Sequence, residues 1–317
     1  MHDLLQIGSF PAVAQALIDA EFRCHSLDQL AQDEALCQRV RGIITRGNYA
    51  VPSEVMARLP ALGVVSTCGV GYDQVDIEAA AERGVQVANT PGVLNDAVAE
   101  LCIGLIFALL RRLPAADRFV RNGDWRAGAV FPLATSLAGK QVGIVGLGRI
   151  GKAIARRLKP FGVGLAYHGR GDQHLQWPFE AELLGLARRS DVLILIAPGG
   201  PDTAAMVDAA VLDALGPRGF LINVARGSVV DEEALIQALQ HGRIAGAALD
   251  VFAREPEVDP RLLELHNVVL TPHIGSATHE TRLAMARLAL DNLHRFFEDG
   301  QVLTPVPLPT PRFETTP

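Results

Sequence analysis

The sequence has no block of Lys and Arg residues, no paired Cys-x-x-Cys spacing and no long hydrophobic run. Its 29 basic and 35 acidic residues give a formal net charge of −6, so we expect no nucleic-acid partner. The longest apolar run, residues 101–110, is too short to cross a bilayer and predicts a buried helix. Residues 1–6 show no basic stretch leading into an apolar one, so we expect no secretory signal, no membrane association and a cytoplasmic protein.

The cysteines and histidines show no metal-binding or disulfide pattern. Cys24, Cys37, Cys68 and Cys102 are spaced too irregularly for a zinc site or a disulfide framework and are expected to be free thiols. The histidines form no His-Glu-x-x-His motif, so we expect no metal. No repeat of the length that builds solenoids is visible. With 317 residues, 49% hydrophobic and 20% charged, the chain is predicted to form about two ordinary globular domains.

Short apolar runs alternate with segments of helical spacing along most of the chain. Runs this short, apolar on both faces, are typical of parallel strands covered by helices. The helical segments include residues 231–239, where Asp231 is a plausible N-cap. We therefore predict an α/β fold with mostly parallel sheets. The predicted strands are 42–45, 64–66, 85–87, 141–145, 163–167, 192–196, 220–224, 244–249 and 268–270.

The strength of these patterns changes along the chain. The strongest runs begin near residue 141 and indicate a cofactor domain in the middle, whereas the first 95 residues fit a second, smaller α/β domain. A predicted helix over about 278–299 is long enough to return and pack on the first domain. The segment from Thr304 holds five prolines and is expected to be an extended arm or disordered.

A glycine-rich turn follows the predicted strand 141–145. It precedes a predicted helix at 152–158 and the next strand, which completes a βαβ unit. In this context the first glycine allows a tight turn, the second lets backbone approach a pyrophosphate, and the third allows helix and strand to pack closely. A turn without a ligand is the alternative. The residues predicted to bind a dinucleotide here are Gly146, Leu147, Gly148, Arg149, Ile150 and Gly151.

The residues after the second strand of this unit bear on the choice of dinucleotide. An NAD site normally has an acidic residue there, but this chain has His168, Gly169 and Arg170. A carboxylate repels a 2′-phosphate, whereas an arginine can bind it with two hydrogen bonds. The sequence therefore favours NADPH. Asp172 keeps NADH as the weaker alternative, because a loop movement would bring it to the ribose.

Several motifs stand along the chain from about Gly69 to Thr278. They are Cys-Gly-Val-Gly-Tyr-Asp at 68–73, Asn-Thr-Pro-Gly-Val-Leu at 89–94, the glycine-rich turn at 146–151, Asn-Val-Ala-Arg-Gly at 223–227, Ala-Leu-Asp-Val-Phe-Ala-Arg-Glu-Pro at 248–256 and Thr-Pro-His-Ile-Gly-Ser at 271–276. In order and spacing these motifs resemble those of the D-isomer-specific 2-hydroxyacid dehydrogenases. Within that family the chain is most similar to NADPH-dependent glyoxylate/hydroxypyruvate reductases, and also to 2-ketogluconate and hydroxyphenylpyruvate reductases. The first 60 residues match less clearly.

The resemblance implies two Rossmann-like domains with the active site in the cleft between them. Residues 1–95 with 282–317 would form the substrate domain, and 96–281 the dinucleotide-binding domain with a dimerisation segment. Members of the family are typically homodimers, and residues 96–133 look like their dimer-forming region. Core packing is the expected role of Trp125 and Phe131 in that region, and closure of a partner's substrate pocket is the alternative.

Three residues are predicted to be catalytic. Arg226 follows a predicted strand, and its planar fork suits a substrate carboxylate; the resemblance makes it the substrate arginine. His273 also follows a strand, and histidine is the side chain best suited to exchange a proton near neutral pH. By resemblance it protonates the C2 oxygen of a 2-oxo acid. Glu255 would pair with it, favouring the imidazolium and fixing the ring.

Further contacts with substrate and cofactor are expected. Gly69, Val70 and Gly71 form a small-residue loop whose amides could receive the substrate carboxylate, a role that only the resemblance raises above a simple turn. By resemblance, Asp250 contacts the nicotinamide carboxamide. Cofactor contacts are also predicted for Pro198, Val224 and Ala225. Residues 197–203 carry an extra glycine where many relatives have Leu-Thr-Pro-x-Thr. This difference affects the predicted contacts between this loop and the cofactor, and it leaves the predicted reaction class unchanged.

These residues predict an NADPH-preferring oxidoreductase that reduces small 2-oxo acids, glyoxylate and hydroxypyruvate first, to D-2-hydroxy acids. Larger 2-oxo acids, such as 2-ketogluconate or aryl pyruvates, are the alternative substrates. A dinucleotide-sensing, corepressor-like binding protein is the alternative outside enzymes. The presence of all three predicted catalytic residues argues against it.

Overall fold

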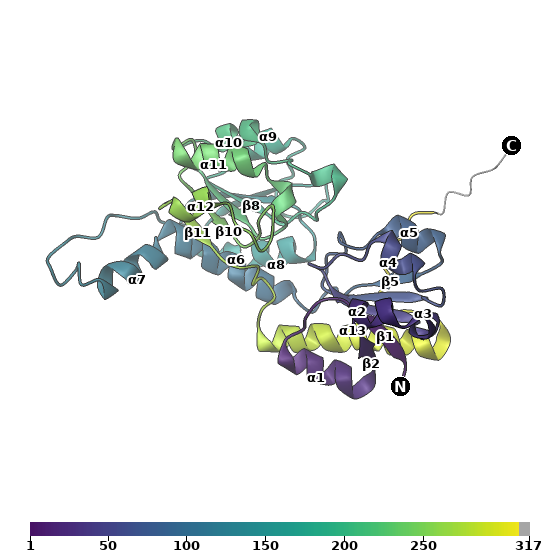
Figure 1. Cartoon of the computed structure of the whole chain (residues 1–317). Helices are drawn as coiled ribbons and strands as arrows, with labels where there is room; N and C mark the ends of the chain where they lie inside the picture. Colours follow the sequence, from purple (N-terminus) through teal and green to yellow (C-terminus); the bar gives the residue numbers. More distant parts are fainter. Residues whose placement is uncertain (311–317) are drawn as a thin grey trace. The chain divides into compact units, whose positions relative to one another are not determined.

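The computed structural model describes residues 1–310 and divides the chain into two compact units. The first unit contains residues 1–94 and the carboxy-terminal segment from Ser276, and the second contains residues 95–275 (Figure 1). Each unit is built around its own parallel sheet, so the predicted α/β class with two parallel sheets is confirmed. The assignment of the units as a substrate and a dinucleotide-binding domain stays a prediction at this point.

The first sheet has five parallel strands in the order β2-β1-β3-β4-β5. Two of them were not predicted. β1 has only two apolar residues and β2 reads Arg-Cys-His, so neither produces an apolar run in the sequence. The strands are β1 (Asp3–Gln6), β2 (Arg23–His25), β3 (Gly42–Arg46), β4 (Val64–Cys68) and β5 (Gln86–Ala88).

Both faces of the first sheet are buried, which explains why its central strands are apolar throughout. In β4, Val64 belongs to one hydrophobic cluster and its neighbour Val65 to the other, because successive side chains point to opposite faces. Both are 0% exposed. One cluster joins the sheet to α1 (Ala12–Glu21) and α13 (His279–Asp299), and the other joins it to α2 (Leu27–Gln32), α3 (Glu34–Arg39), α4 (Ser53–Ala57) and α5 (Ile77–Glu82).

The predicted carboxy-terminal helix is confirmed as α13. Thr278 caps it by accepting a hydrogen bond from the Thr281 amide at 3.1 Å. After the helix the chain runs extended along β5, where the Val306 amide donates to the Val87 carbonyl at 2.8 Å. The proline-rich segment is therefore an extended arm up to residue 310, and residues 311–317 lie outside the described part.

The second sheet has six parallel strands in the order β11-β10-β9-β8-β6-β7. β6 lies between β7 and β8, so the strand order reverses there. In open α/β sheets, ligands bind outside the carboxyl ends of the strands at such a switch point. The strands are β6 (Gln141–Val145), β7 (Gly164–His168), β8 (Val192–Leu195), β9 (Phe220–Asn223), β10 (Gly246–Leu249) and β11 (Val268–Leu270).

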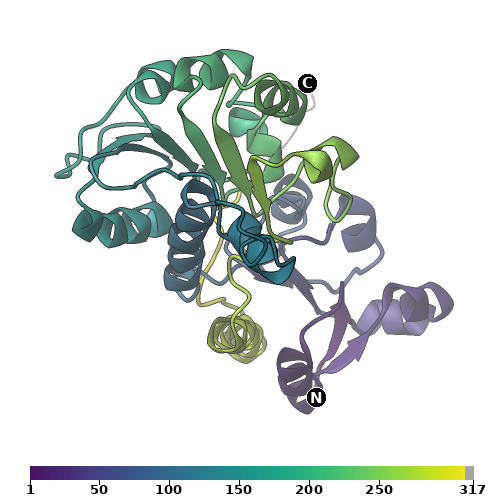
Figure 2. The ribbon, with the colours of Figure 1, turned by 90° about the vertical axis from the view of Figure 1, so that its left-hand side faces the viewer.

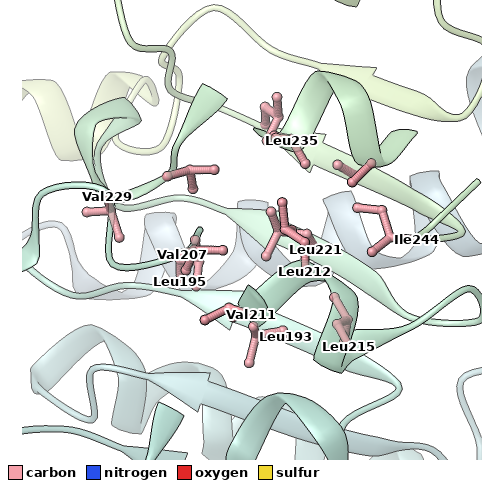
Figure 3. Close-up of a cluster of buried hydrophobic side chains, with 14 of the residues drawn as sticks. Leu193, Leu195, Val207, Val211, Leu212, Leu215, Leu221, Val229, Leu235 and Ile244 are labelled. Atoms are coloured by element: carbon pink, nitrogen blue, oxygen red, sulfur yellow. The ribbon is translucent and has the colours of Figure 1, made fainter. Parts of the chain in front are cut away.

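Helices cover both faces of the second sheet (Figures 1 and 2). Leu193, Leu221 and Leu212 belong to a fully buried cluster between the sheet and the helices on one face (Figure 3). One face carries α9 (Leu183–Arg188), α10 (Ala209–Leu215) and α11 (Glu232–Gln240), and the other face carries α6 (Asn95–Leu110) and α8 (Arg149–Leu158). The remaining helices of the unit are α7 (Leu113–Arg121) and α12 (Pro260–Glu264), with the short 3₁₀ helices η1 (Lys159–Phe161), η2 (Pro201–Thr203) and η3 (Gly227–Val229).

An arm extends from the second unit after α6. It consists of α7 and the segment 122–136, and Figure 1 shows it reaching away from the sheet. Its apolar side chains are open to solvent: Trp125 is 70% exposed, Val130 89% and Leu133 99%. The expectation that Trp125 packs in the core is therefore wrong, whereas Phe131 packs edge-on against Phe119 within the arm. No helix of residues 1–310 combines the length and apolarity needed to span a membrane.

Candidate active site

The three predicted catalytic residues follow three neighbouring strands of the second sheet. Arg226 comes after β9, Glu255 after β10 and His273 after β11. Since parallel strands place their carboxyl ends at one edge of the sheet, the three turns leave the sheet side by side. All three residues lie within residues 95–275 and so belong to one unit.

Glu255 and His273 form a hydrogen-bonded pair. The Nδ1 atom of His273 lies 2.6 Å from Oε2 of Glu255, whose Oε1 accepts a hydrogen bond from the Phe252 amide at 3.1 Å. Burial by itself raises the pKa of Glu255, but the hydrogen bond and charge of His273, the Phe252 amide and the charge of Arg226 outweigh it and lower the pKa. Because Nδ1 faces Glu255, Nε2 is the ring atom left to exchange a proton with a substrate.

The buried carboxylate of Asp250 holds the turn that carries His273. Its Oδ1 accepts hydrogen bonds from Thr271 Oγ1 at 2.7 Å and the Ile274 amide at 2.8 Å, and its Oδ2 accepts from the Gly275 amide at 2.8 Å. The carbonyl of Asp250 accepts from the His273 amide at 2.9 Å. Burial raises the pKa of Asp250 despite these bonds. Its carboxylate thus positions His273, and its predicted contact with nicotinamide stays a prediction.

The turn that carries Arg226 is shaped by Asn223, which is 1% exposed. Oδ1 of Asn223 accepts from the Ala225 amide at 3.0 Å, and its Nδ2 donates to the Arg226 carbonyl at 3.0 Å. At Gly227 this turn packs directly on the backbone of the turn before Glu255. A Cβ added at Gly227 would lie 1.9 Å from the Phe252 carbonyl carbon, so only glycine permits this contact. Arg226 is half-buried, and its Nη1 donates to the Ala225 carbonyl at 2.7 Å.

The glycine-rich turn joins β6 to α8 as expected, although the helix begins at Arg149, three positions before the predicted 152. Gly146 has φ +98°, and a Cβ there would lie 2.7 Å from the Ala197 amide nitrogen in the turn after β8. A Cβ at Gly151 would lie 2.3 Å from the Gly146 carbonyl oxygen. At Gly148, by contrast, a Cβ would meet no described atom within 4 Å. Two glycines thus serve internal packing, and the middle one faces open space before the helix amides.

The other predicted cofactor residues lie at the same edge of the sheet. His168 ends β7, and its Nδ1 lies 3.0 Å from the Glu180 carbonyl. Arg170, two residues on, is exposed and makes no hydrogen bond or ion pair within residues 1–310. The predicted cofactor residues Gly169 and Pro198 lie in the turns after β7 and β8, and Val224 and Ala225, which are 7% and 4% exposed, follow β9.

The predicted substrate loop, Gly69 to Gly71, follows β4 in the first unit. The Thr90 amide donates to the Gly69 carbonyl at 2.8 Å, and Asn89 Nδ2 donates to the Val70 carbonyl at 2.8 Å. These bonds engage the loop carbonyls. The predicted role of the loop amides in binding a substrate carboxylate stays a prediction.

The structure adds positioning residues that sequence reasoning missed. Asn223, Gly227 and Thr271 each stand in a motif quoted above, but no role was derived for them. For Asn223 and Thr271 the available signal was the placement of a polar residue directly at the end of an apolar strand, since a buried polar side chain must find hydrogen-bond partners. Gly227 gave no such signal. Within residues 1–310, no cluster of three His, Cys, Asp or Glu side chains is arranged to bind a metal.

The Glu255→Gln variant tests the pairing with His273. Because the pKa of Glu255 is below its ordinary value of 4.5 in the folded protein, its contribution to stability is complete above that pH and is lost as the pH falls through the folded pKa. We expect the wild type to unfold at a higher temperature than the variant at neutral pH, with the difference shrinking at acid pH. Thermal unfolding over a pH series measures this, with Glu257→Gln as the exposed control. A difference in unfolding temperature that does not change with pH would contradict the assigned contact between Glu255 and His273.

Comparison with known proteins places this arrangement in a family. The family profile described as "D-isomer specific 2-hydroxyacid dehydrogenase, NAD binding domain" matches residues 103–275. A 2-ketogluconate reductase of Gluconobacter oxydans is 46% identical over 307 residues, 96% of this chain and 98% of the relative. Glyoxylate/hydroxypyruvate reductase A of Arabidopsis thaliana is 46% identical over 268 residues, 84% of this chain and 85% of the relative.

A solved structure agrees over nearly the whole chain. The NADPH-dependent glyoxylate/hydroxypyruvate reductase of Sinorhizobium meliloti, in complex with NADP and malonate, superposes with a TM-score of 0.91 at 46% identity. The match covers 98% of this chain and 98% of that one. The predicted family is therefore confirmed: the chain belongs to the D-isomer specific 2-hydroxyacid dehydrogenases.

Proposed function

We propose that this protein is an NADPH-preferring reductase that converts small 2-oxo acids, glyoxylate and hydroxypyruvate first, into D-2-hydroxy acids. The observation that carries the proposal is the His273–Glu255 pair, 2.6 Å apart, on the sheet edge that also bears Arg226 and the glycine-rich turn. The family and the names of its similar relatives support the same reaction class.

Each of the three residues has a chemical task in this reaction. The Arg226 guanidinium binds the substrate carboxylate with two hydrogen bonds and polarises the adjacent carbonyl. His273 donates the proton on Nε2 to the C2 oxygen as it gains negative charge. Glu255 accepts the hydrogen bond from Nδ1, which holds the ring in place and stabilises the imidazolium before transfer. When bound, the reduced nicotinamide supplies the hydride that C2 receives, so that the carbonyl becomes a secondary alcohol, or a primary alcohol from glyoxylate.

The second unit has the features that a dinucleotide needs. Open space at Gly148 and the first amides of α8 fit a pyrophosphate, because the amino-terminal end of a helix attracts anions. His168 ends β7 and Gly169 and Arg170 follow it, at the place where the adenosine ribose is bound in this fold, and the exposed Arg170 would bind a 2′-phosphate. NADPH is therefore the proposed cofactor, with NADH as the weaker one.

Larger 2-oxo acids are the second candidate substrates. The 2-ketogluconate reductase and a hydroxyphenylpyruvate reductase of Plectranthus scutellarioides are both 46% identical to the chain, as is the Arabidopsis glyoxylate/hydroxypyruvate reductase. Identity therefore does not separate the substrate classes. A dinucleotide-sensing protein, the alternative outside enzymes, would not need the His273–Glu255 pair.

We propose further that the protein is a cytoplasmic homodimer that binds neither nucleic acid nor membrane. A cytoplasmic location agrees with the free thiols of Cys24, Cys37, Cys68 and Cys102, because a reducing compartment keeps thiols in that state. The arm of the second unit supports dimerisation. Its apolar side chains Trp125, Val130 and Leu133 are exposed together on one segment, which is typical of a surface that binds a partner.

The first experiment measures nicotinamide oxidation by the wild type and by His273→Gln. We expect the wild type to turn over NADPH faster than NADH, with glyoxylate and hydroxypyruvate ahead of 2-ketogluconate and phenylpyruvate. In His273→Gln, kcat should fall about 10²- to 10⁴-fold, the usual contribution of a general acid, while NADPH binding persists. His266→Gln, an exposed histidine before β11, is the matched control. Equal turnover in all three proteins would refute the role of His273 as the acid, and a wild type that shows no turnover with any of these substrates would sink the enzyme proposal.

Alanine at two positions of the glycine-rich turn should separate packing from cofactor binding. Gly146→Ala is expected to lower the temperature of unfolding, because its Cβ would collide with the turn after β8 and its φ is positive. Gly148→Ala should leave the unfolding temperature unchanged but weaken NADPH binding, since its methyl group enters the open space. Thermal unfolding and cofactor titration measure the two effects. Unchanged NADPH affinity in a folded Gly148→Ala would contradict the pyrophosphate assignment.

The dimer is tested by placing charge on the arm. We expect the wild type to sediment as a dimer and the double variant Val130→Asp/Leu133→Asp to sediment as a monomer, because a charged side chain opposes burial. Leu263→Asp, at a site 64% exposed outside the arm, should remain dimeric. Sedimentation velocity gives the answer. A monomeric wild type, or a double variant that stays dimeric, would refute this role of the arm.

A further inference from the structure

The first six residues after β7 contain one carboxylate, Asp172, and that carboxylate is bound by its own loop. Residues 169–174 read Gly-Arg-Gly-Asp-Gln-His. Oδ1 of Asp172 accepts hydrogen bonds from the Tyr167 hydroxyl and from the His174 amide, each at 2.8 Å, and its Oδ2 lies 3.4 Å from His174 Nδ1. Asp172 therefore faces back toward the strand end.

The Tyr167 hydroxyl is the centre of this arrangement. Besides donating to Asp172, it accepts a hydrogen bond from the Gln173 amide at 2.7 Å. The side chain of Gln173 in turn donates to the Leu147 carbonyl of the glycine-rich turn at 2.9 Å. One buried hydroxyl thus determines how the loop folds and ties it to the predicted pyrophosphate site.

Tyr167 is itself held rigidly. It is 0% exposed, and its ring packs on Phe179 with the ring centres 5.4 Å apart. Its amide donates to the Pro178 carbonyl at 2.9 Å, and its carbonyl accepts from the Glu180 amide at 2.8 Å. The hydroxyl therefore has a defined position from which to hold the loop.

The hydrogen bonds and the charge of the Asp172 carboxylate affect which dinucleotide the loop can bind. A carboxylate that selects NAD must accept hydrogen bonds from the ribose hydroxyls. An ionised carboxylate oxygen has about two lone-pair sites, and both sites of Oδ1 are already used. The hydrogen bonds from His174 and Tyr167 also lower the pKa of Asp172, so it is charged at neutral pH and would repel a 2′-phosphate if it were released.

We propose that Tyr167 is a positioning residue for cofactor choice: its hydroxyl retains Asp172 on the loop, which keeps the carboxylate away from the ribose and leaves the 2′-phosphate to Arg170. This inference rests on the proposed use of NADPH. It attributes the preference for NADPH to two groups. The Arg170 guanidinium attracts the 2′-phosphate, and the Tyr167 hydroxyl holds the Asp172 carboxylate away from it.

The variant Tyr167→Phe tests the inference, because it keeps the ring and removes only the hydroxyl. We expect the ratio of kcat/KM for NADPH to that for NADH to fall about tenfold, the size of effect that one hydrogen bond to a charged group supplies. The change should come from a higher KM for NADPH, with kcat retained. General damage to the fold would weaken both cofactors alike and leave the ratio unchanged, and thermal unfolding checks the fold directly.

The double variant Tyr167→Phe/Asp172→Asn shows whether the carboxylate is responsible. Asparagine keeps the size of Asp172 without its charge, so the cofactor ratio should return toward the wild-type value. Asp213→Asn, which removes an exposed carboxylate that pairs with Arg243 at 2.9 Å, should leave the ratio unchanged. An unchanged ratio in Tyr167→Phe, or no recovery in the double variant, would overturn the inference. A wild type that binds neither cofactor would instead refute the proposed function.

Discussion

All six strands of the second sheet run in the same direction, and this constraint brings the residues of the candidate site to one edge of the sheet. Every turn with a proposed catalytic or dinucleotide-binding residue leaves the sheet at the carboxyl ends of its strands. The sheet contributes little chemistry itself, because its central strands β8, β9 and β10 are apolar and almost wholly buried. Its role is to hold neighbouring turns at the spacing of adjacent strands, so that residues far apart in sequence, such as Arg226 and His273, leave the sheet at the same edge.

Within that edge, a buried anion sets the local geometry. Asp250 is 1% exposed, and a buried carboxylate is tolerated only when hydrogen bonds replace the water it has lost. Those bonds come from the residues on either side of His273, whose own φ of +53° costs on the order of 1 kcal/mol or more for a side chain with a Cβ. The hydrogen bonds to the Asp250 carboxyl group thus offset the strain at His273 and hold it in the conformation in which it faces Glu255.

Much of this arrangement could be predicted from the sequence, for physical reasons that differ from residue to residue. The central strands are short apolar runs, and the glycine-rich turn stands between a strand and a helix, which is the context that a dinucleotide site requires. β1 and β2 were missed because their burial depends on distant segments, chiefly α1 and α13. The hydrogen bonds by which Asp250 and Asn223 hold their turns could not be predicted, because a pattern shows where a polar residue stands but not which amides it meets. Trp125 was expected in the core because a large aromatic residue usually packs there, and the sequence has no signal for an arm that leaves the sheet.

The packing of Gly227 on the backbone of Phe252 has a consequence for how such an enzyme diversifies. With main chain against main chain, the turn with Arg226 and the turn leading to Glu255 cannot shift separately, so the proposed carboxylate recognition and the proposed proton delivery would form one rigid module. In the proposed reaction, this module contacts only the part that every 2-oxo acid shares, its carboxylate and adjacent carbonyl. Adaptation to longer or bulkier side chains must therefore arise in other loops, which lets substrate range evolve without disturbing the reaction.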